Sequence, residues 1–326
     1  MRPTVSVVIT TYNQERYISA TLESALAQDF EDREIIVVDD GSTDDTPRRV
    51  GAFGDRVVYL RQPNQGVAGS RNSGIRRARG EFLAFLDGDD LWERSKLSRQ
   101  VRAARDQPLS GMIVADGMQF ADEATILKTS FVAPSIRALL GTSESVTVRC
   151  YDQLLQQNVI LTSSQVLIPR EVLDQVGLSD VRIGNASDWD LYLRIAARYE
   201  ITFLGAALTR WRYLPTSVSG PQHLRELRWA ADEIAVLRKH LHHAAPEFRP
   251  RIRTLIKTRT FERAYAIYSH GKGTDTAFAR AQLLRLLRAH PTSPMVLAFL
   301  AALHLPRSLN RRLRSLGSRL LSHARR

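Results

Sequence analysis

Three aspartates crowd the end of a short apolar run. Asp87, Asp89 and Asp90 follow the run at residues 82–86, with a single glycine among them. Carboxylates this close repel one another unless a cation neutralises them, and Mg²⁺ prefers hard oxygen ligands, usually one or two carboxylates together with substrate phosphates. The stretch therefore predicts a metal and diphosphate site. The alternative is a solvated acidic turn that caps a helix beginning near Trp92.

A second apolar run ends in the same way. Residues 34–38 are followed directly by Asp39 and Asp40. Open α/β sheets bind their ligands beyond the carboxyl ends of the strands, so two acidic strand ends at one edge of a sheet should share one pocket. Such a pocket suits a ligand that is cationic or rich in hydroxyl groups.

Strands and helices alternate through the first hundred residues. This alternation predicts an α/β fold with a mostly parallel sheet and right-handed crossovers. Ser42 or Thr43 is expected to cap the second helix. The predicted strands are 5–10, 34–38, 57–60 and 81–86, and the predicted helices are 15–28, one from Pro47, and 66–79.

Two common phosphate-binding loops are missing from the sequence. A dinucleotide-binding fold would carry Gly-x-Gly-x-x-Gly after the first strand, where this chain has Thr-Tyr-Asn-Gln at residues 11–14. A Gly-rich loop ending in Gly-Lys-Ser or Gly-Lys-Thr is also missing. The sequence therefore disfavours a dehydrogenase.

The pattern is weaker in the second half of the chain. Residues 122–147 give no consistent periodicity, and Ser187 is expected to cap a helix that contains Asp188 and Asp190. On a helix, residues two apart face different directions, so these two carboxylates should have different surroundings. The other predicted elements are helices 93–105, 151–157 and 169–176, strands 111–120, 164–168, 201–208 and 209–213, and helices from residue 222 onward.

The composition is that of an ordinary globular protein. The 326 residues are 44% hydrophobic and 25% charged. Cys150 is the single cysteine, so no intrachain disulfide can form. The first residues run straight into a strand pattern, so no signal peptide is expected. The late apolar run 295–305 is shorter than the roughly 20 residues that a membrane-spanning helix needs.

The positive charge is concentrated in the last quarter of the chain. Residues 251–326 hold sixteen Lys and Arg against two acidic residues, and the first 250 residues therefore carry a net charge of −2 although the whole chain carries +12. Within 308–321 the leucines form one stripe beside an arginine face, a pattern that favours an anionic membrane surface. Packing on the core or on another subunit is the alternative. Few aromatics and no recognised motif argue against nucleic acid.

Six short motifs, in this order and spacing, resemble those of the family 2 glycosyltransferases. The resemblance covers residues 5–219. The motifs are VSVVITTYN at 5–13, VDDGSTD at 38–44, GVAGSRNSG at 66–74, FLDGDD at 85–90, SDWDL at 187–191 and WRY at 211–213.

The resemblance implies a GT-A fold, a mostly parallel sheet flanked by helices, over residues 1–220. About 1–100 would form the nucleotide-binding half and 101–220 the acceptor half, followed by a helical basic region at 221–326. It implies an inverting, bacterial polysaccharide-type enzyme that moves a sugar from a nucleoside-diphosphate donor, with UDP-sugar favoured, to a hydroxyl of a glycan or lipid-linked acceptor. The expected location is the cytoplasm, with peripheral contact at the inner face of the membrane as an option.

The resemblance also assigns seven residues to the nucleotide. Tyr12 would form an apolar wall of the base pocket. Asp39 would accept a hydrogen bond from the base or ribose, because a carboxylate only accepts, which suits the N–H of uracil. Arg71 would offer its fork of donors. The alternatives are that one of the paired aspartates only caps the next helix and that Arg71 forms a surface salt bridge. The seven residues are Thr11, Tyr12, Asn13, Asp39, Asp40, Arg71 and Asp87.

The chemical step is implied in the same way. Asp89 would be the direct ligand of Mg²⁺ or Mn²⁺, Asp87 would face the ribose or a metal-bound water, and Asp90 would support both. The metal would neutralise charge on the departing diphosphate. Asp188 would be the general base that takes the proton of the acceptor hydroxyl, or else only a first-turn residue favoured by the helix dipole. Arg212 would contact the diphosphate.

The chain departs from the family pattern at several positions. Ser187 stands where many relatives have Glu, and Leu178-Ser179 stand where they often have Gly-Phe. Leu214 replaces the histidine of a common Tyr-Arg-x-His motif. Leucine cannot ligate a metal, so no third protein ligand is assigned.

Two other functions are compatible with an α/β sheet of this kind. A sugar-nucleotide nucleotidyltransferase is also Mg²⁺-dependent, but the Gly-rich, Arg-containing loop that it needs after the first strand is missing. A non-catalytic scaffold of the same fold, recruited through the basic tail, is the other alternative. Activity after Asp188→Asn would separate a scaffold from an enzyme.

Overall fold

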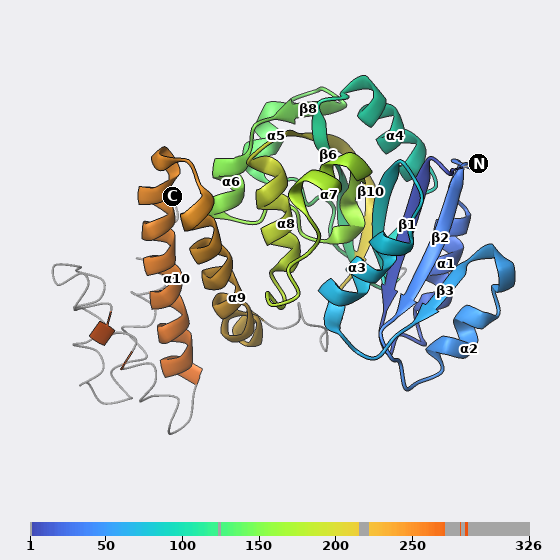
Figure 1. Ribbon diagram of the computed structural model, residues 1–326, viewed down its shortest axis with the longest axis horizontal. Coiled ribbons are helices and arrows are strands. Elements are labelled where there is room, and N and C mark those ends of the chain that lie inside the picture. The colour runs from blue at the N-terminus through green and yellow to red at the C-terminus, as the bar shows by residue number, and fades with distance from the viewer. Residues whose placement is uncertain (1, 123–124, 215–221, 271–280, 282–283, 286–326) are drawn as a thin grey trace.

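The computed structural model describes residues 2–122, 125–214, 222–270, 281 and 284–285. Strands and helices alternate through its first part as predicted (Figure 1). In chain order the elements are β1 (Val5–Thr11), α1 (Ile18–Leu26), β2 (Arg33–Asp39), α2 (Thr46–Gly51), η1 (Gly54–Arg56), β3 (Val58–Arg61), α3 (Gly66–Arg77), β4 (Phe82–Asp87), β5 (Leu91–Trp92) and α4 (Lys96–Asp106).

The second part is more irregular, as its weaker sequence pattern indicated. Two long strands, β6 and β10, hold its shorter elements together. The elements are β6 (Ser110–Asp122), β7 (Thr125–Lys128), α5 (Pro134–Leu140), β8 (Ser145–Val148), α6 (Tyr151–Gln156), η2 (Ser163–Gln165), β9 (Val166–Pro169), α7 (Arg170–Val176), α8 (Ser187–Ala196), β10 (Glu200–Arg212), α9 (Gln222–His243), η3 (Pro246–Phe248) and α10 (Arg249–His270).

The strands of the described chain form one sheet in the order β3-β2-β1-β4-β9-β6-β10-β5, with β7 paired to β6 and β8 to β10. β1 is parallel to β2 and β4, and β6 is parallel to β10. β9 runs antiparallel between β4 and β6, so these two strands share one direction. The predicted mostly parallel sheet is therefore confirmed, with only short strands running against it.

The two acidic strand ends meet at one edge of this sheet. β1 lies between β2 and β4, with Thr11 opposite Asp39 on one side and Thr10 opposite Asp87 on the other. The prediction that both ends share one edge is confirmed. The ligand site expected there is bounded by residues from three adjacent strands.

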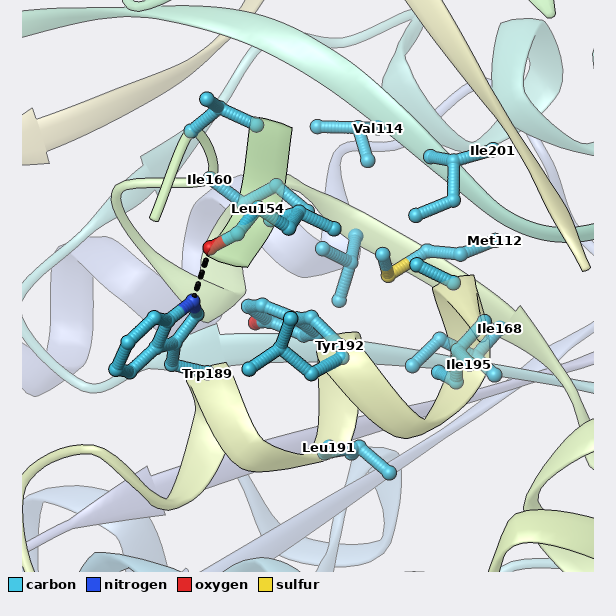
Figure 2. Close-up of a cluster of buried hydrophobic side chains, with 14 of the residues drawn as sticks. Met112, Val114, Leu154, Ile160, Ile168, Trp189, Leu191, Tyr192, Ile195 and Ile201 are labelled. Atoms are coloured by element: carbon cyan, nitrogen blue, oxygen red, sulfur yellow. Dashed lines mark hydrogen bonds between the residues drawn. The ribbon is translucent and has the colours of Figure 1, made fainter. Parts of the chain in front are cut away.

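Two apolar layers hold the sheet in place. Alternate residues of a strand face opposite sides, so Val8 packs with α3, α6 and α8 on one side while Val7 and Ile9 pack with α1 and α4 on the other. Figure 2 shows part of the first layer, where Met112 of β6 meets side chains of α8. Cys150 is fully buried in the same layer. Helices thus cover both faces of the sheet.

Several predicted boundaries and caps are wrong. No helix begins near Trp92, because Trp92 pairs with Thr209 in the short strand β5 and α4 starts only at Lys96. The acidic turn is therefore not a helix cap. Neither Ser42 nor Thr43 caps α2, which begins at Thr46, and no side chain caps it. The first helix is also shorter than predicted, because residues 15–17 form a turn.

Two further predictions fail in the region of α8. Ser187 is the first helical residue and not its cap, and its buried hydroxyl has no hydrogen-bond partner. The Trp189 amide is instead satisfied by the Asp188 carboxylate at 2.7 Å. The two strands predicted at 201–208 and 209–213 are one strand, β10, whose register against β6 shifts after Leu204 and again after Ala207.

The last described elements form a helical hairpin beside the core. α9 and α10 lie side by side, and α9 faces α6 and α8 (Figure 1). The amphipathic segment predicted at 308–321 lies outside the described residues. Among the residues that are described, no helix is both long and apolar enough to cross a membrane.

Candidate active site

The acidic turn after β4 is fastened to β1 and α1. The Gly88 amide donates to the Thr10 carbonyl at 2.9 Å. The Thr21 hydroxyl lies within hydrogen-bond distance of the carbonyl oxygens of Gly88 and Asp90, at 3.0 and 2.9 Å. A Cβ at residue 88 would collide with the Gln14 side chain and lie 3.0 Å from the Thr10 carbonyl oxygen. Only glycine therefore lets the turn approach β1 this closely.

Asp90 is a buried structural carboxylate with no exposed surface. Its Oδ1 accepts a hydrogen bond from the Arg212 amide at 3.0 Å, and its Oδ2 accepts from the hydroxyls of Ser164 at 2.6 Å and Thr162 at 3.2 Å. Burial, then the charges of the neighbouring aspartates, raise its pKa well above the ordinary value. Asp90 thus ties the turn to β10 and η2, which suits the supporting role predicted for it.

Arg71 of α3 forms an ion pair with the turn. Its Nη2 donates to Asp87 Oδ1 at 2.9 Å, and the residue is 8% exposed, so it is not a surface salt bridge. Burial lowers the pKa of the guanidinium, but the carboxylates of Asp87 and Asp188 outweigh burial and raise it. The buried Nε has no partner. Arg71 therefore stays charged and keeps one donor available for a further acceptor.

Asp188 stands in the first turn of α8, about a hundred residues after the acidic turn, and is half-buried. Burial raises the pKa of its carboxyl group, and the positive charge of Arg71 partly opposes this shift. The charge of Asp87 acts on it as well, in the same direction as burial. The structure thus brings Asp188 to the Arg71–Asp87 pair. A carboxylate with a raised pKa is a stronger general base.

Asp89 has the surroundings of a metal ligand. Burial and the charge of Asp87 raise its pKa to about 6, against weaker opposing effects from Arg212 and Gln14. A divalent cation would relieve this crowding of negative charge. No group of three or more His, Cys, Asp or Glu side chains in the described residues is arranged to hold a metal ion. Asp89 and Asp87 therefore fit a magnesium-type site in which substrate phosphates supply the remaining ligands.

Arg212, at the end of β10, lies against the same turn. Its Nε donates to the Asp89 carbonyl at 2.9 Å. Its guanidinium lies over the rings of Phe120 and Tyr17, at 4.4 and 4.8 Å from their centroids. Two aromatic rings and one hydrogen bond fix the side chain beside the predicted metal ligand. Its contact with a diphosphate stays a prediction.

The paired aspartates after β2 face inward. Asp39 has no exposed surface, and its two oxygens accept from the Ser42 amide at 2.8 Å and the Tyr59 hydroxyl at 2.6 Å. Asp40 accepts from the amides of Gln65 at 2.9 Å and Gly66 at 2.8 Å. Neither aspartate caps the next helix, α2, so that alternative is wrong; the two amides that Asp40 binds stand at the start of α3. Contacts of either residue with a nucleotide remain predictions.

The loop after β1 carries one side chain that is held by a hydrogen bond, that of Asn13; the side chains of Thr11 and Tyr12 before it have no such bond within the described residues. Asn13 has a positive φ of 52°, and its Oδ1 accepts from the Thr43 amide at 2.8 Å, which joins the loops after β1 and β2. Tyr12 is 48% exposed, as a wall of an open base pocket would be. The hydroxyl of Thr11 is buried without a partner. All three border the edge where the acidic strand ends meet.

The sequence prediction missed the contribution of Thr162 and Ser164. Besides binding Asp90, the Thr162 hydroxyl lies 3.3 Å from Asp87 Oδ2, and the Ser164 hydroxyl accepts from the Asp87 amide at 3.1 Å. Thr162 and Gln165 form a capping box around η2, a local pattern that is visible in the sequence. That pattern predicts the turn, but it cannot predict what the turn touches.

The family model described as "Glycosyl transferase family 2" matches residues 6–177. An uncharacterised glycosyltransferase of Rickettsia typhi is 30% identical over 200 residues, which are 60% of this chain and 61% of that protein. A Bacillus subtilis protein named teichuronic acid biosynthesis glycosyltransferase TuaG is 34% identical over 56% of this chain and 68% of its own length. The matched part of the chain thus spans less than two thirds of the length of the first of these relatives.

Among solved structures, Staphylococcus aureus TarS 1–349 in complex with UDP-GlcNAc has a similar fold. The TM-score is 0.65 at 19% sequence identity, and the alignment covers 89% of this chain and 81% of that one. At this identity the likeness concerns the fold, and the predicted GT-A fold is confirmed.

Proposed function

Because the chain belongs to glycosyl transferase family 2, we propose that it moves a sugar from a nucleoside-diphosphate donor to a hydroxyl group of an acceptor, with inversion at the anomeric carbon. The observation that carries the proposal is the convergence of Asp188 from α8 with the Arg71–Asp87 pair at the edge of the sheet. In this arrangement Asp188 would be the general base, Arg71 the cation and Asp87 a metal ligand close to one another. The family predicted from the motifs is confirmed, whereas the roles of individual residues are proposals.

In the proposed reaction, the acceptor oxygen forms a bond to the anomeric carbon while the bond from that carbon to the diphosphate oxygen breaks. Asp188 takes the hydroxyl proton, and the nucleoside diphosphate leaves with the electron pair. The raised pKa of Asp188 favours proton transfer. Arg71 and Arg212 would bind the phosphate oxygens through charged donors. A single displacement needs no covalent enzyme intermediate.

Asp89 and Asp87 would hold Mg²⁺ or Mn²⁺ together with the diphosphate. When bound, the ion supplies a positive charge that stabilises the leaving group. The support is the raised pKa of Asp89, which is caused first by burial of its carboxyl group and then by the negative charge of Asp87.

We favour a UDP-sugar as the donor. Tyr12, Thr11 and Asp39 line the edge where the base would bind, and TarS, which has the same fold, was solved with UDP-GlcNAc. Local rearrangement would be needed for Asp39 to reach the base, since it is fully buried. Asn13 and Asp40 would then act by holding the loops that carry the nucleotide contacts.

The proposed acceptor is a glycan or a lipid-linked glycan. TuaG, whose name refers to teichuronic acid biosynthesis, supports an acceptor of this class. A lipid-linked acceptor would explain the basic carboxyl-terminal region, which would then contact an anionic membrane surface from the cytoplasmic side. Arg249 and Arg253 are exposed on α10. Salt-sensitive sedimentation with phosphatidylglycerol vesicles, but not with phosphatidylcholine vesicles, would support this contact.

The proposal is tested by incubating purified protein with a panel of UDP-, GDP- and dTDP-sugars. Release of one nucleoside diphosphate with Mg²⁺ or Mn²⁺, abolished by chelator, is the expected result and identifies the donor. Asp188→Asn should remove turnover and keep nucleotide binding. Asp106→Asn, on an exposed carboxylate at the end of α4, is the control. Folded protein that neither binds nor turns over any of these donors would instead support the scaffold alternative.

A further inference from the structure

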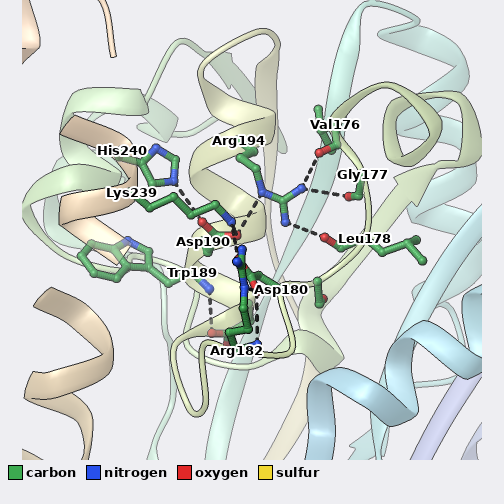
Figure 3. Close-up of polar contacts among 12 residues, drawn as sticks. Val176, Gly177, Leu178, Asp180, Arg182, Trp189, Asp190, Arg194, Lys239 and His240 are labelled. Carbon is green, nitrogen blue, oxygen red and sulfur yellow. Dashed lines mark hydrogen bonds and ion pairs between the residues drawn. The ribbon is translucent and has the colours of Figure 1, made fainter. Parts of the chain in front are cut away.

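Three consecutive side chains of α8 point in three directions. Asp188 belongs to the candidate active site. Trp189 is buried in the apolar layer, and its indole N–H donates to the Leu154 carbonyl at 2.8 Å (Figure 2). Asp190 turns toward α9 (Figure 3). An α-helix rotates by about 100° per residue, so each of these contacts restricts the rotation of α8 about its axis. The direction of Asp188 therefore depends on the other two.

Asp190 is fully buried and lies among three cationic or ionisable groups. Its Oδ2 accepts from Lys239 Nζ at 2.9 Å and Arg194 Nε at 3.0 Å, and its Oδ1 lies 3.3 Å from His240 Nε2 (Figure 3). Burial opposes ionisation, but these partners outweigh it and hold the pKa of Asp190 below its usual range. Lys239 and His240 both belong to α9. The partner helix thus supplies two of the three groups.

The loop that leads into α8 is bound by the same helix. Lys239 Nζ also donates to Asp180 Oδ2 at 3.0 Å. The amide and side chain of Asn185 both donate to Asp232 Oδ2 of α9, at 2.9 and 3.2 Å. A Cβ at Gly184 would lie 3.0 Å from that same oxygen, so backbone and helix are in close contact. α9 therefore binds the segment 180–190 on both sides of Asp188.

We propose that α9 is a positioning element for the general base, with Lys239 and Asp232 as its positioning residues. The inference rests on the proposed function, because it concerns the orientation of the Asp188 carboxylate as general base. The boundary predicted near residue 220 would then separate two regions of the sequence that act together in catalysis. The first helix of the basic region would belong to the catalytic machinery.

The size of the effect follows from the geometry. Displacing a reacting group by about 1 Å can cost about a hundredfold in rate. Lys239→Met would leave Asp190 with Arg194 and His240 and would release the loop at Asp180. We therefore expect kcat to fall by about tenfold to a hundredfold. Binding of a nucleoside diphosphate should change less than about twofold, because the hydrogen bonds and ion pairs described above join Arg71 and the acidic turn to each other and to β1, α1, β10 and η2.

Arg259→Met is the matched control. Arg259 is also mostly buried in the helical hairpin, and it binds Glu233 of α9, Glu262 and the Gln156 carbonyl, but not the segment 180–190. Both variants remove one cation from the hairpin, so both should lower the melting temperature. Only Lys239→Met should lower kcat and accelerate backbone hydrogen exchange in 180–196. Lys239→Arg should restore both.

The inference would be overturned by a Lys239→Met variant that loses stability as Arg259→Met does but keeps the kcat and the hydrogen-exchange rates of the wild-type protein. If Lys239→Met does not fold, Asp232→Ala provides the same comparison through the Asn185 contact. If the wild-type protein transfers no sugar, the proposed function fails. Hydrogen exchange still decides whether α9 orders the segment.

Discussion

Lys96 is the most unusual ionisable group in the described core, and it offers a sharp test of the structure. It has no exposed surface, and its Nζ donates to Gln100 Oε1 at 2.6 Å. No carboxylate in the described part of the chain forms an ion pair with it. Burial lowers its pKa well below the ordinary value. We predict that Lys96→Met changes the pH dependence of stability.

Two effects act on this amine in opposite directions. Nζ lies 4.0 Å from the centroid of the Trp92 ring, and a desolvated cation–π contact favours the charged form by about 2 kcal/mol. Burial of an unpaired ammonium costs several kcal/mol. Burial is the larger effect, so the folded protein should hold Lys96 neutral, and a neutral amine still donates to Gln100.

The sign of the pH dependence follows from proton binding. Between the lowered folded pKa and 10.5, the unfolded chain holds a proton on Lys96 that the folded chain lacks. Folding stability therefore rises with pH in this window, by up to about 1.4 kcal/mol per pH unit. Where this window overlaps pH 7 to 9, the unfolding free energy of the wild-type protein should rise with pH relative to that of Lys96→Met.

Urea unfolding of both proteins at pH 7, 8 and 9 measures this difference. Lys128→Met is the control, because Lys128 also lies over an aromatic ring, 5.7 Å from the centroid of Phe131, but is exposed. The difference in unfolding free energy between wild type and Lys128→Met should show no comparable rise with pH. Parallel pH profiles for wild type and Lys96→Met would refute the reasoning, since they would mean that Lys96 stays charged in the folded state.

Three shorter predictions concern the site. Asp188→Asn should lower the rate of sugar transfer by at least about a hundredfold and leave the dissociation constant for a nucleoside diphosphate nearly unchanged, as kinetics and calorimetry can test. Gly88→Ala should lower the melting temperature and weaken Mn²⁺-dependent nucleotide binding, because the new Cβ collides with the Gln14 side chain; unchanged binding would contradict the tight turn. Tyr59→Phe should cost about 1–3 kcal/mol in urea unfolding, because it removes a hydrogen bond of the buried Asp39 carboxylate.

Local patterns predicted the elements of the first half well. Buried strands are continuous apolar runs, and the parallel arrangement of β1, β2 and β4 puts their acidic ends at one edge. The place of Asp188 could be inferred only from the family resemblance, because about a hundred residues and several elements separate it from Asp87. Such a contact is set by tertiary packing, which no local pattern encodes.

The failed predictions have a common physical origin. Ser187 has the chemistry of a cap, but the Asp188 carboxylate binds the Trp189 amide in the first turn of α8 in its place. Ser42 accepts from the Asn13 amide at 3.0 Å, so it joins two loops and does not cap α2. Competing tertiary partners decided each case.

The buried position of Cys150 has a practical consequence for watching this protein at work. The single thiol of the chain has no exposed surface, and burial raises its pKa to about 12, so it should not react with maleimides in the folded state. A cysteine substituted for the exposed Val181 would then be the one reactive thiol, and no native residue would have to be removed first. A dye attached there would sit on the loop ahead of α8 and report in real time when that loop moves.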